Sequence, residues 1–139
     1  MIDLIVFSVE ANRYALSIDN VKRIIQAVDL ITIPSAHELI DGMMSYENSV
    51  VKVLNFRKLI GLESKEVIGE DTSKFLFYEN DKENFAIKVD NIDDIAHINE
   101  SDIMNKKDNN TNDEFLELSG VLDIDGVLIN VIKIIHLPK

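Results

Sequence analysis

The residues of this chain that could do chemistry are three histidines and two close pairs of carboxylates. His37, His97 and His136 lie in separate segments, and no two of them have the i, i+4 spacing of a helical metal site. Asp93-Asp94 and the Asp123-x-Asp125 pair could bind a cation, but a solvated strand edge and a tight turn explain these pairs more simply. Because isolated histidines are usually surface or capping residues, the sequence predicts no metal site.

Other catalytic groups are scarce. The 139 residues include no cysteine, which excludes disulfides, thiol nucleophiles and cysteine metal ligands. The sequence has no glycine-rich phosphate loop, and no serine, histidine and aspartate stand in a known catalytic motif. These features give no support to catalysis, so a protein without catalytic activity is the first class of function. A small enzyme with an acidic pocket is a second class of function, against which the lack of a motif argues.

The net charge of the chain also limits which classes of partner it is expected to bind. Fourteen lysines and arginines oppose 25 aspartates and glutamates, so the formal net charge is −11. Such a surface repels the phosphate backbone of nucleic acids and anionic lipid, so neither is an expected partner. No apolar run approaches the roughly 18 residues of a membrane-spanning helix, and residues 1–7 lack a basic region. The expected location is therefore the cytoplasm, without insertion into a membrane.

The elements that must position any binding residues are mostly strands. Apolar residues are largely β-branched or leucine and often alternate with polar ones, which is typical of half-buried strands. The Asp-Gly step at 125–126 is a strong hairpin signal. The predicted strands are 6–9, 14–18, 49–56, 74–78, 84–89, 116–123 and 127–132.

The remaining segments are less regular. Residues 20–25 have mixed periodicity and form either a helical turn or a short strand. A short helix is predicted over 35–40, with Ser35 as N-cap, Glu38 closing a capping box and Gly42 ending it. Segment 57–60 is helical, 63–73 is a charged linker, and 105–114 is a mobile loop. About ten short strands and a few single-turn helices indicate small barrels rather than a βαβ sheet.

Two segments of the sequence repeat in order. Residues 15–21 match 86–92, and residues 42–54 match 120–132, with apolar positions falling on apolar positions without a gap. The two pairs are either copies of one small β unit or amphipathic hairpins that look similar by chance. The first interpretation gives two halves, approximately 10–62 and 74–137. A groove lined with aliphatic side chains at their seam would suit a partner helix.

Four blocks of the sequence resemble the CheW-like domain of bacterial chemotaxis coupling proteins. Residues 14–18 are similar to a strand that follows a tight turn in that family. Pro34 and residues 42–56 resemble the family's proline-started helix, its Asn-Leu-Arg-Gly loop and the next strand. Residues 86–95 resemble a later strand, and 119–134 resemble the closing hairpin. The resemblance covers nearly the whole chain. It depends on the order and spacing of the four blocks, since no single block is diagnostic.

The resemblance implies a fold and a role. The fold would be mainly β, a single domain over residues 1–139, with two SH3-like five-stranded barrels around a shared hydrophobic core and a few short helices. The role would be a non-enzymatic scaffold, without cofactor, in the cytoplasm or at membrane-associated receptor arrays. It would link the cytoplasmic tips of methyl-accepting chemoreceptors to the regulatory domain of the histidine kinase CheA. Alternatives are an adaptor for a non-flagellar chemosensory pathway and an oligomerisation module that binds no receptor.

The partner-binding residues that the resemblance implies are Val21, Arg23, Gly42, Ser45, Tyr46, Glu47 and Asn48. Tyr46 stands at the tip of a predicted turn, where an aromatic side chain either packs locally or binds a partner. Glu47 replaces the arginine of the family's loop, and Arg23 stands where members often carry an acidic residue. Lys52 and Asn55 replace the proline and aspartate of the following strand. Charge reversal at a contact changes the choice of partner more than the fold, and neutral drift is the alternative explanation.

Overall fold

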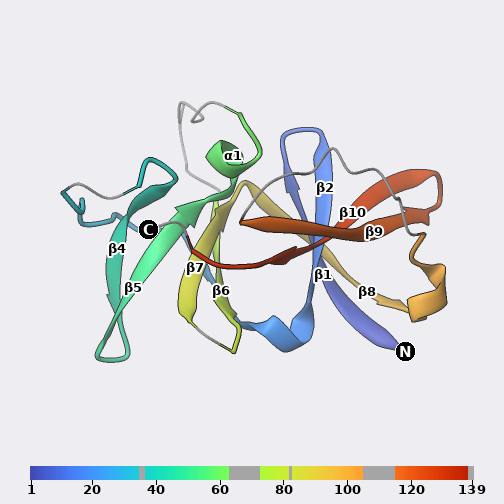
Figure 1. Cartoon of the computed structure of the whole chain (residues 1–139), viewed down its shortest axis with the longest axis horizontal. Coiled ribbons are helices and arrows are strands. Elements are labelled where there is room, and N and C mark those ends of the chain that lie inside the picture. Colours follow the sequence, from blue (N-terminus) through green and yellow to red (C-terminus); the bar gives the residue numbers. More distant parts are fainter. Residues whose placement is uncertain (35–36, 63–72, 82, 105–114, 138–139) are drawn as a thin grey trace.

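The computed structural model describes residues 1–34, 37–62, 73–81, 83–104 and 115–137. These residues form ten strands in two five-stranded sheets, with little helix (Figure 1). The first sheet has the order β8 (Asn91–Ile98), β1 (Ile2–Val9), β2 (Asn12–Ser17), β10 (Val127–Ile134) and β9 (Leu116–Ile124). The second sheet has the order β3 (Val21–Gln26), β6 (Lys74–Glu79), β7 (Asn84–Val89), β5 (Ser49–Asn55) and β4 (Ile40–Tyr46). The helical elements are α1 (Phe56–Leu59) and the single 3-10 turns Ile18–Asn20 and Glu100–Asp102.

The largest hydrophobic core lies between the two sheets. Ile5 and Leu16 of the first sheet pack in one buried cluster with Leu54, Leu76 and Ile87 of the second. Two smaller clusters lie within the individual sheets. Since burial of apolar surface is the main favourable term in folding, the shared cluster fastens one sheet to the other.

The repeated segments occupy corresponding places in the two sheets. Val131 of β10 pairs in parallel with Ala15 of β2, and Val53 of β5 pairs in parallel with Ala86 of β7. In the first sheet the hairpin β1–β2 comes from the N-terminal part of the chain and β8, β9 and β10 from the C-terminal part. In the second sheet β3, β4 and β5 come from the N-terminal part and the hairpin β6–β7 from the C-terminal part. Neither sheet consists of one half of the chain alone. The boundaries 10–62 and 74–137 stay a prediction.

Each sheet curls, and its two edges approach each other at one point. After β3, Ile31 forms a single antiparallel bridge with Met43 of β4; after β8, Met104 forms one with Val121 of β9. Both bridges are made of paired N–H···O bonds of 2.8–2.9 Å. In the described residues these contacts do not extend into a continuous ladder, so the expectation of closed SH3-like barrels is not confirmed.

The short helix predicted over 35–40 is wrong in its described part. His37 to Leu39 form a turn in which the Ile40 N–H donates to the carbonyl of His37 at 2.9 Å, and β4 begins at Ile40. Gly42 lies inside β4 and does not end a helix. Ile40, Gly42 and Met44 are buried at alternate positions, a period of two that fits a strand. Ser35 and Ala36 lie outside the described residues.

Most other predicted elements are present. The predicted hairpins correspond to β1–β2, β6–β7 and β9–β10, and the ambiguous segment 20–25 is mainly strand β3. Helix α1 follows β5 directly and is capped by Asn55, whose Oδ1 accepts from the Lys58 N–H at 3.2 Å. The predicted linker 63–73 (apart from Ser73) and the predicted loop 105–114 lie outside the described residues.

Candidate partner-binding site

The β4–β5 hairpin places the predicted contact loop at one end of the second sheet. Tyr46 pairs with Ser49, and the two residues between them, Glu47 and Asn48, have φ angles of 48° and 65°. Positive φ at both central residues is the geometry of a type I′ turn, whose twist matches that of the flanking strands. This turn sets Glu47 at the tip of the hairpin and Tyr46 at the end of β4.

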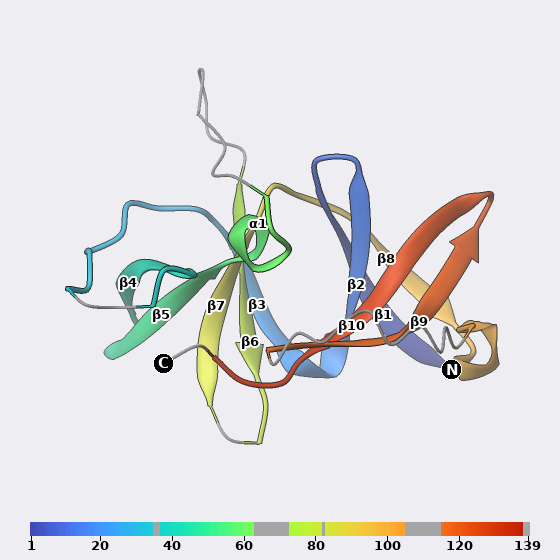
Figure 2. The same ribbon diagram turned by 45° about the horizontal axis from the view of Figure 1, so that its top comes forward.

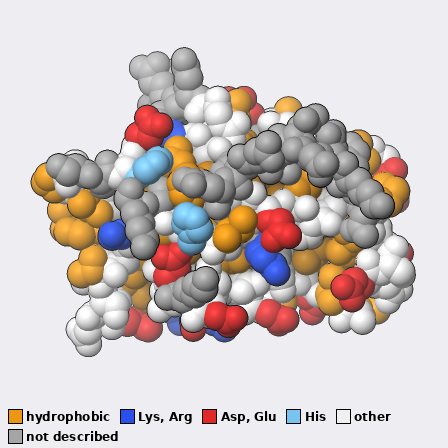
Figure 3. Space-filling view, viewed as in Figure 1, with side chains coloured by type: hydrophobic (Ala, Val, Ile, Leu, Met, Phe, Trp, Pro, Cys, Tyr) orange, Lys and Arg blue, Asp and Glu red, His pale blue; other side chains and the backbone are white. Residues whose placement is uncertain are grey.

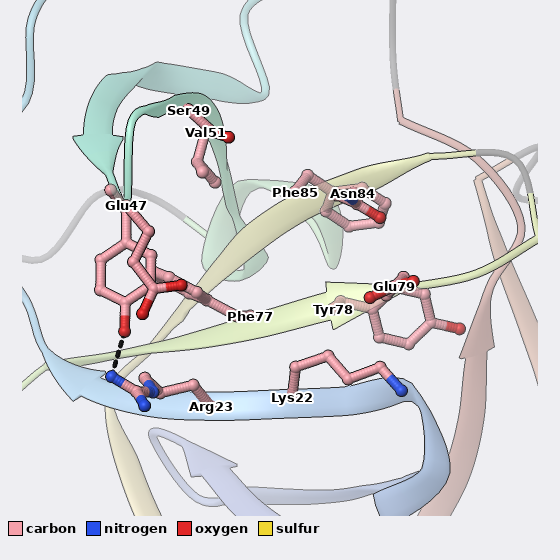
Figure 4. A pocket seen from close by; sticks show the side chains of 11 residues that line it. Lys22, Arg23, Glu47, Ser49, Val51, Phe77, Tyr78, Glu79, Asn84 and Phe85 are labelled. Carbon is pink, nitrogen blue, oxygen red and sulfur yellow. Dashed lines mark hydrogen bonds between the residues drawn. The ribbon is translucent and has the colours of Figure 1, made fainter.

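A groove of about 360 Å³ opens beside this turn (Figure 4). We call it the Tyr46 groove; its lining residues are Lys22, Arg23, Tyr46, Glu47, Ser49, Val51, Phe77, Tyr78, Glu79, Asn84 and Phe85. They come from β3, the β4–β5 hairpin, and the β6–β7 hairpin. The structure therefore brings together Arg23, Tyr46 and Glu47, three of the predicted contact residues.

Tyr46 is held from two sides. The Arg23 Nη1 donates a hydrogen bond to the Tyr46 hydroxyl, and the guanidinium carbon lies 5.6 Å from the centre of the tyrosine ring. The ring also meets Phe77 edge-on, with ring centres 4.6 Å apart and planes at 89°. Tyr46 thus packs locally and still lines an open groove, half-buried. Contact with a partner stays a prediction for this residue.

The chemistry of the groove is that of a surface for a protein side chain. Val51, Phe77 and Phe85 give it apolar and aromatic walls, while charged groups of both signs line the rim. Lys22 and Arg23 extend from β3, and Glu47 projects from the hairpin turn (Figure 4). Apolar walls inside a polar rim are the usual anatomy of a protein–protein contact.

Tyr78 supports the groove from inside. It is 2% exposed, and its hydroxyl donates to the carbonyl of Ile134 at 3.3 Å. Burial raises the pKa of Tyr78 above the ordinary 10.0. The hydroxyl is therefore neutral at physiological pH. Its hydrogen bond joins β6 of the second sheet to β10 of the first.

The other predicted contact residues lie elsewhere. Val21 is buried opposite Tyr78 in the β3–β6 pair, and Gly42 lies along β4 against Ile31, away from the groove lining. Ser45 and Asn48 are exposed on the hairpin but do not line the groove. Val21 and Gly42 are buried within the fold, and contact of these four residues with a partner stays a prediction.

Sequence reasoning missed the β6–β7 side of the groove. Phe77 and Phe85 lie in a hairpin that was predicted, but the pairing of β6 with β3 was not. No local pattern signals that pairing, because the two strands are about fifty residues apart in the chain. The alternation of phenylalanines in β6 signals an aromatic face.

The histidines and carboxylate pairs have structural partners. His97 Nδ1 lies 2.6 Å from Asp3 Oδ1, and the rings of His37 and His136 both meet Phe115 edge-on. Asp93 accepts from Ser8 and pairs with Arg13 at 3.3 Å. In the part of the chain that the structure describes, no group of three or more potential metal ligands gathers. Within the same residues, no helix is long and apolar enough to cross a membrane.

Apolar side chains gather on the surface near this site. On the face shown in Figure 3 they cluster at the end of the molecule that carries β4 and β5. Val28, Ile31 and Val50 are among the most exposed large apolar residues, at 50%, 61% and 68%. Contiguous exposed apolar surface is a mark of interaction sites.

Comparison with known proteins gives one consistent family. Residues 3–139 match the family model described as CheW-like domain. The chain is 24% identical over 129 residues to the chemotaxis protein CheW of Bacillus subtilis (strain 168), covering 93% of this chain and 81% of that protein. It is 23% identical over 64 residues to CheW of Thermotoga maritima, covering 46% and 42% of the two chains.

A solved structure has the same fold. The scaffolding protein CheW from Thermoanaerobacter tengcongensis superposes with a TM-score of 0.83 at 24% sequence identity. The superposition covers 96% of this chain and 89% of that one. The arrangement of two sheets described above is therefore shared along almost the entire length.

Proposed function

The chain belongs to the CheW-like domain family, and from this premise we propose that it is a non-enzymatic scaffold of bacterial chemotaxis signalling. Its partners would be the cytoplasmic tips of methyl-accepting chemoreceptors and the regulatory domain of the histidine kinase CheA. It would act in the cytoplasm, at receptor arrays next to the membrane. The observation that carries the proposal is the family match over residues 3–139.

The Tyr46 groove is the proposed contact surface for a receptor segment. Tyrosine and arginine are, with tryptophan, the residue types enriched at the energetic centre of protein interfaces, and Tyr46 and Arg23 meet at the rim of this groove. Val51 and Phe77, both half-buried, offer an apolar wall for a partner side chain. Glu47 at the hairpin tip would then select the charge of the partner.

The finer description of the fold also stays a proposal. Each curled sheet, with the single bridge between its opposite edges, would correspond to one SH3-like barrel of the family. Each barrel would be built from strands of both predicted halves, 10–62 and 74–137. The correspondence of the parallel pairs Val131–Ala15 and Val53–Ala86 supports this proposal.

Direct binding measurements test the proposed function. The chain would be titrated separately with the regulatory domain of CheA and with a receptor tip from the same bacterium. Binding of both is the expected result. Failure to bind either one would contradict the scaffold role and favour an oligomerisation module. If the receptor tip binds, the other signalling proteins encoded beside that receptor's gene would show whether the pathway controls flagella or another output.

A matched pair of variants tests the assignment of the groove. Arg23→Ala removes the cation that holds Tyr46, while Arg13→Ala removes an exposed cation on the first sheet that pairs with Asp93. We expect the first variant to weaken receptor binding and the second to leave it unchanged. If the two variants change receptor affinity equally, the receptor does not bind in the groove. That result would leave the assignment to the family unchanged.

A further inference from the structure

Arg57 is a buried arginine that the proposed scaffold role does not use. It lies in α1, directly after β5 of the second sheet, and its side chain is 9% exposed. Its Nη1 donates to Asp90 Oδ2 at 2.7 Å, and its Nη2 donates to Glu10 Oε1. The Asp90 side chain is 14% exposed and that of Glu10 is 52% exposed.

These three residues come from the places where the two sheets meet. Glu10 begins the turn between β1 and β2 of the first sheet, with φ at 55°. Asp90 is the residue between β7 of the second sheet and β8 of the first. Asp90 Oδ2 also accepts from the Glu10 backbone N–H at 3.2 Å. Figure 2 shows α1, the β1–β2 turn and the β7–β8 connection on the same side of the molecule.

The surroundings of Arg57 favour its charged form. Burial alone would lower the pKa of Arg57, but the hydrogen bonds and negative charges of Glu10 and Asp90 outweigh it and raise that pKa. A buried guanidinium is tolerated only while it is paired, and its planar fork fixes the direction of both bonds. The cluster therefore constrains orientation as well as distance.

The shared hydrophobic core cannot supply that constraint by itself. Apolar contacts between Leu16, Leu54 and their neighbours are strong in sum but non-directional, so they hold the two sheets together without fixing the direction of any one contact. Arg57 instead fixes the end of one hairpin of the first sheet against a helix of the second. A scaffold that holds two partners in a defined relation needs such a fixed junction.

We propose that Arg57, Glu10 and Asp90 form a clamp that makes the two sheets open as one unit. With the clamp intact, a fluctuation that opens the second sheet also opens the first. With the clamp broken, the two sheets remain folded but open separately. This inference does not depend on which partner occupies the Tyr46 groove.

Native-state amide hydrogen exchange on the full chain tests the clamp. The readout is the protection of the slowest amides in β1 and in β7, which are interior strands of the first and second sheets. In the unmodified chain these two protection factors should agree. In Arg57→Met they should differ by tenfold or more, because one sheet then opens without the other. Glu10→Gln should separate them in the same direction by a smaller factor.

Arg13→Met is the control. It removes an arginine paired with an aspartate, but Arg13 and Asp93 both belong to the first sheet, so the two protection factors should stay equal. The proposal is overturned if protection in β1 and β7 falls by the same factor in Arg57→Met, since that is a plain loss of stability. If Arg57→Met does not fold, Glu10→Gln decides, and equal protection in that variant overturns the clamp.

Discussion

Arg23 and Tyr46 connect the two edges of the second sheet. Arg23 belongs to β3 and Tyr46 to β4, which stand at opposite ends of the strand order, yet the guanidinium donates to the tyrosine hydroxyl. The pair shows how far the sheet curls, because flat edge strands four places apart would be well beyond the reach of side chains. Any change to either residue therefore acts both on the groove and on the curvature beneath it.

The two contributions of Tyr46 can be separated by substitution. Tyr46→Phe removes the hydrogen bond to Arg23 but keeps the ring on Phe77, so a loss of about 0.5–1.5 kcal/mol in the free energy of unfolding is expected. Tyr46→Ala also removes the aromatic contact, which contributes a further ~0.5–1.5 kcal/mol in addition to the buried area. Urea unfolding of both variants measures the difference. Equal losses would mean that the ring contact contributes nothing.

Three glycines offer a second test of the fold. A Cβ at Gly120 would lie 2.7 Å from the Met104 carbonyl oxygen, and one at Gly42 would lie 2.6 Å from that of Ile31. Gly126 has φ of +85° with open space around it. Gly42→Ala and Gly120→Ala should each destabilise by about 1–3 kcal/mol through overpacking against the backbone.

Gly126→Ala is the control for these two, because it introduces backbone strain without a clash. It should cost about 1–2 kcal/mol. Chemical denaturation ranks the three variants, and Gly42→Ala, which combines a clash with φ of +156°, should be the least stable. A Gly42→Ala variant as stable as the unmodified chain would contradict the Ile31–Met43 bridge.

Tyr78, which is buried, and Tyr14, which is half-buried, predict a loss of stability in alkali. Burial raises the pKa values of Tyr14 and Tyr78 above the ordinary 10.0. Their contribution to stability is complete below pH 10.0 and declines above it, because the unfolded chain then ionises while the folded chain does not. Unfolding free energy should therefore fall as pH rises above 10. Tyr78→Phe should flatten that decline, and an unchanged slope would contradict the burial of its hydroxyl.

The shared core predicts a single unfolding transition. Residues of both sheets contribute to one buried cluster, and Arg57 joins the same two sheets, so in the unmodified chain both sheets should unfold together. Calorimetry should give one peak, with the van't Hoff enthalpy equal to the calorimetric enthalpy. Two well-separated transitions would be incompatible with a common core.

The sequence was most informative where structure is local. Alternation of apolar residues predicted the hairpins, and the Asp125-Gly126 step marked the turn between β9 and β10, where both φ angles are positive. The order of the four family blocks predicted a contact surface around Arg23, Tyr46 and Glu47. The structure brings these three residues to one groove.

Pairings between segments that are distant in the chain could not be predicted from the sequence. Capping signals around 35–40 favoured a helix, but the bridge between Ile31 and Met43 and the inward alternation of β4 made the described part a turn and a strand. The role of Arg57 was also invisible, because it depends on Glu10 and Asp90, far away in the chain. Local propensity yields to such tertiary contacts, which no single segment encodes.

Glu47 should decide which receptor the chain binds. The resemblance to the family's loop implies that Glu47 replaces an arginine, and that Arg23 on the other side of the groove stands where members often carry an acid. If this paired reversal reflects a partner with reversed charges, the chain binds a receptor from its own organism tightly and receptors of the common type weakly. Drift of two exposed charges is the alternative, since isolated surface charges contribute little.

Substitution at two equivalent turns separates these explanations. Glu47→Arg should weaken binding of the native receptor tip by about 1–3 kcal/mol if the contact is desolvated. Asp125→Arg is the matched control, because Asp125 occupies the same first position of the corresponding turn, with φ of 53° against 48° for Glu47. Both changes put an arginine at positive φ, so any difference in affinity comes from the location of the charge. Titration of the receptor tip against the two variants gives that difference. Equal affinities for Glu47→Arg and the unmodified chain would remove Glu47 from the interface and leave drift as the explanation.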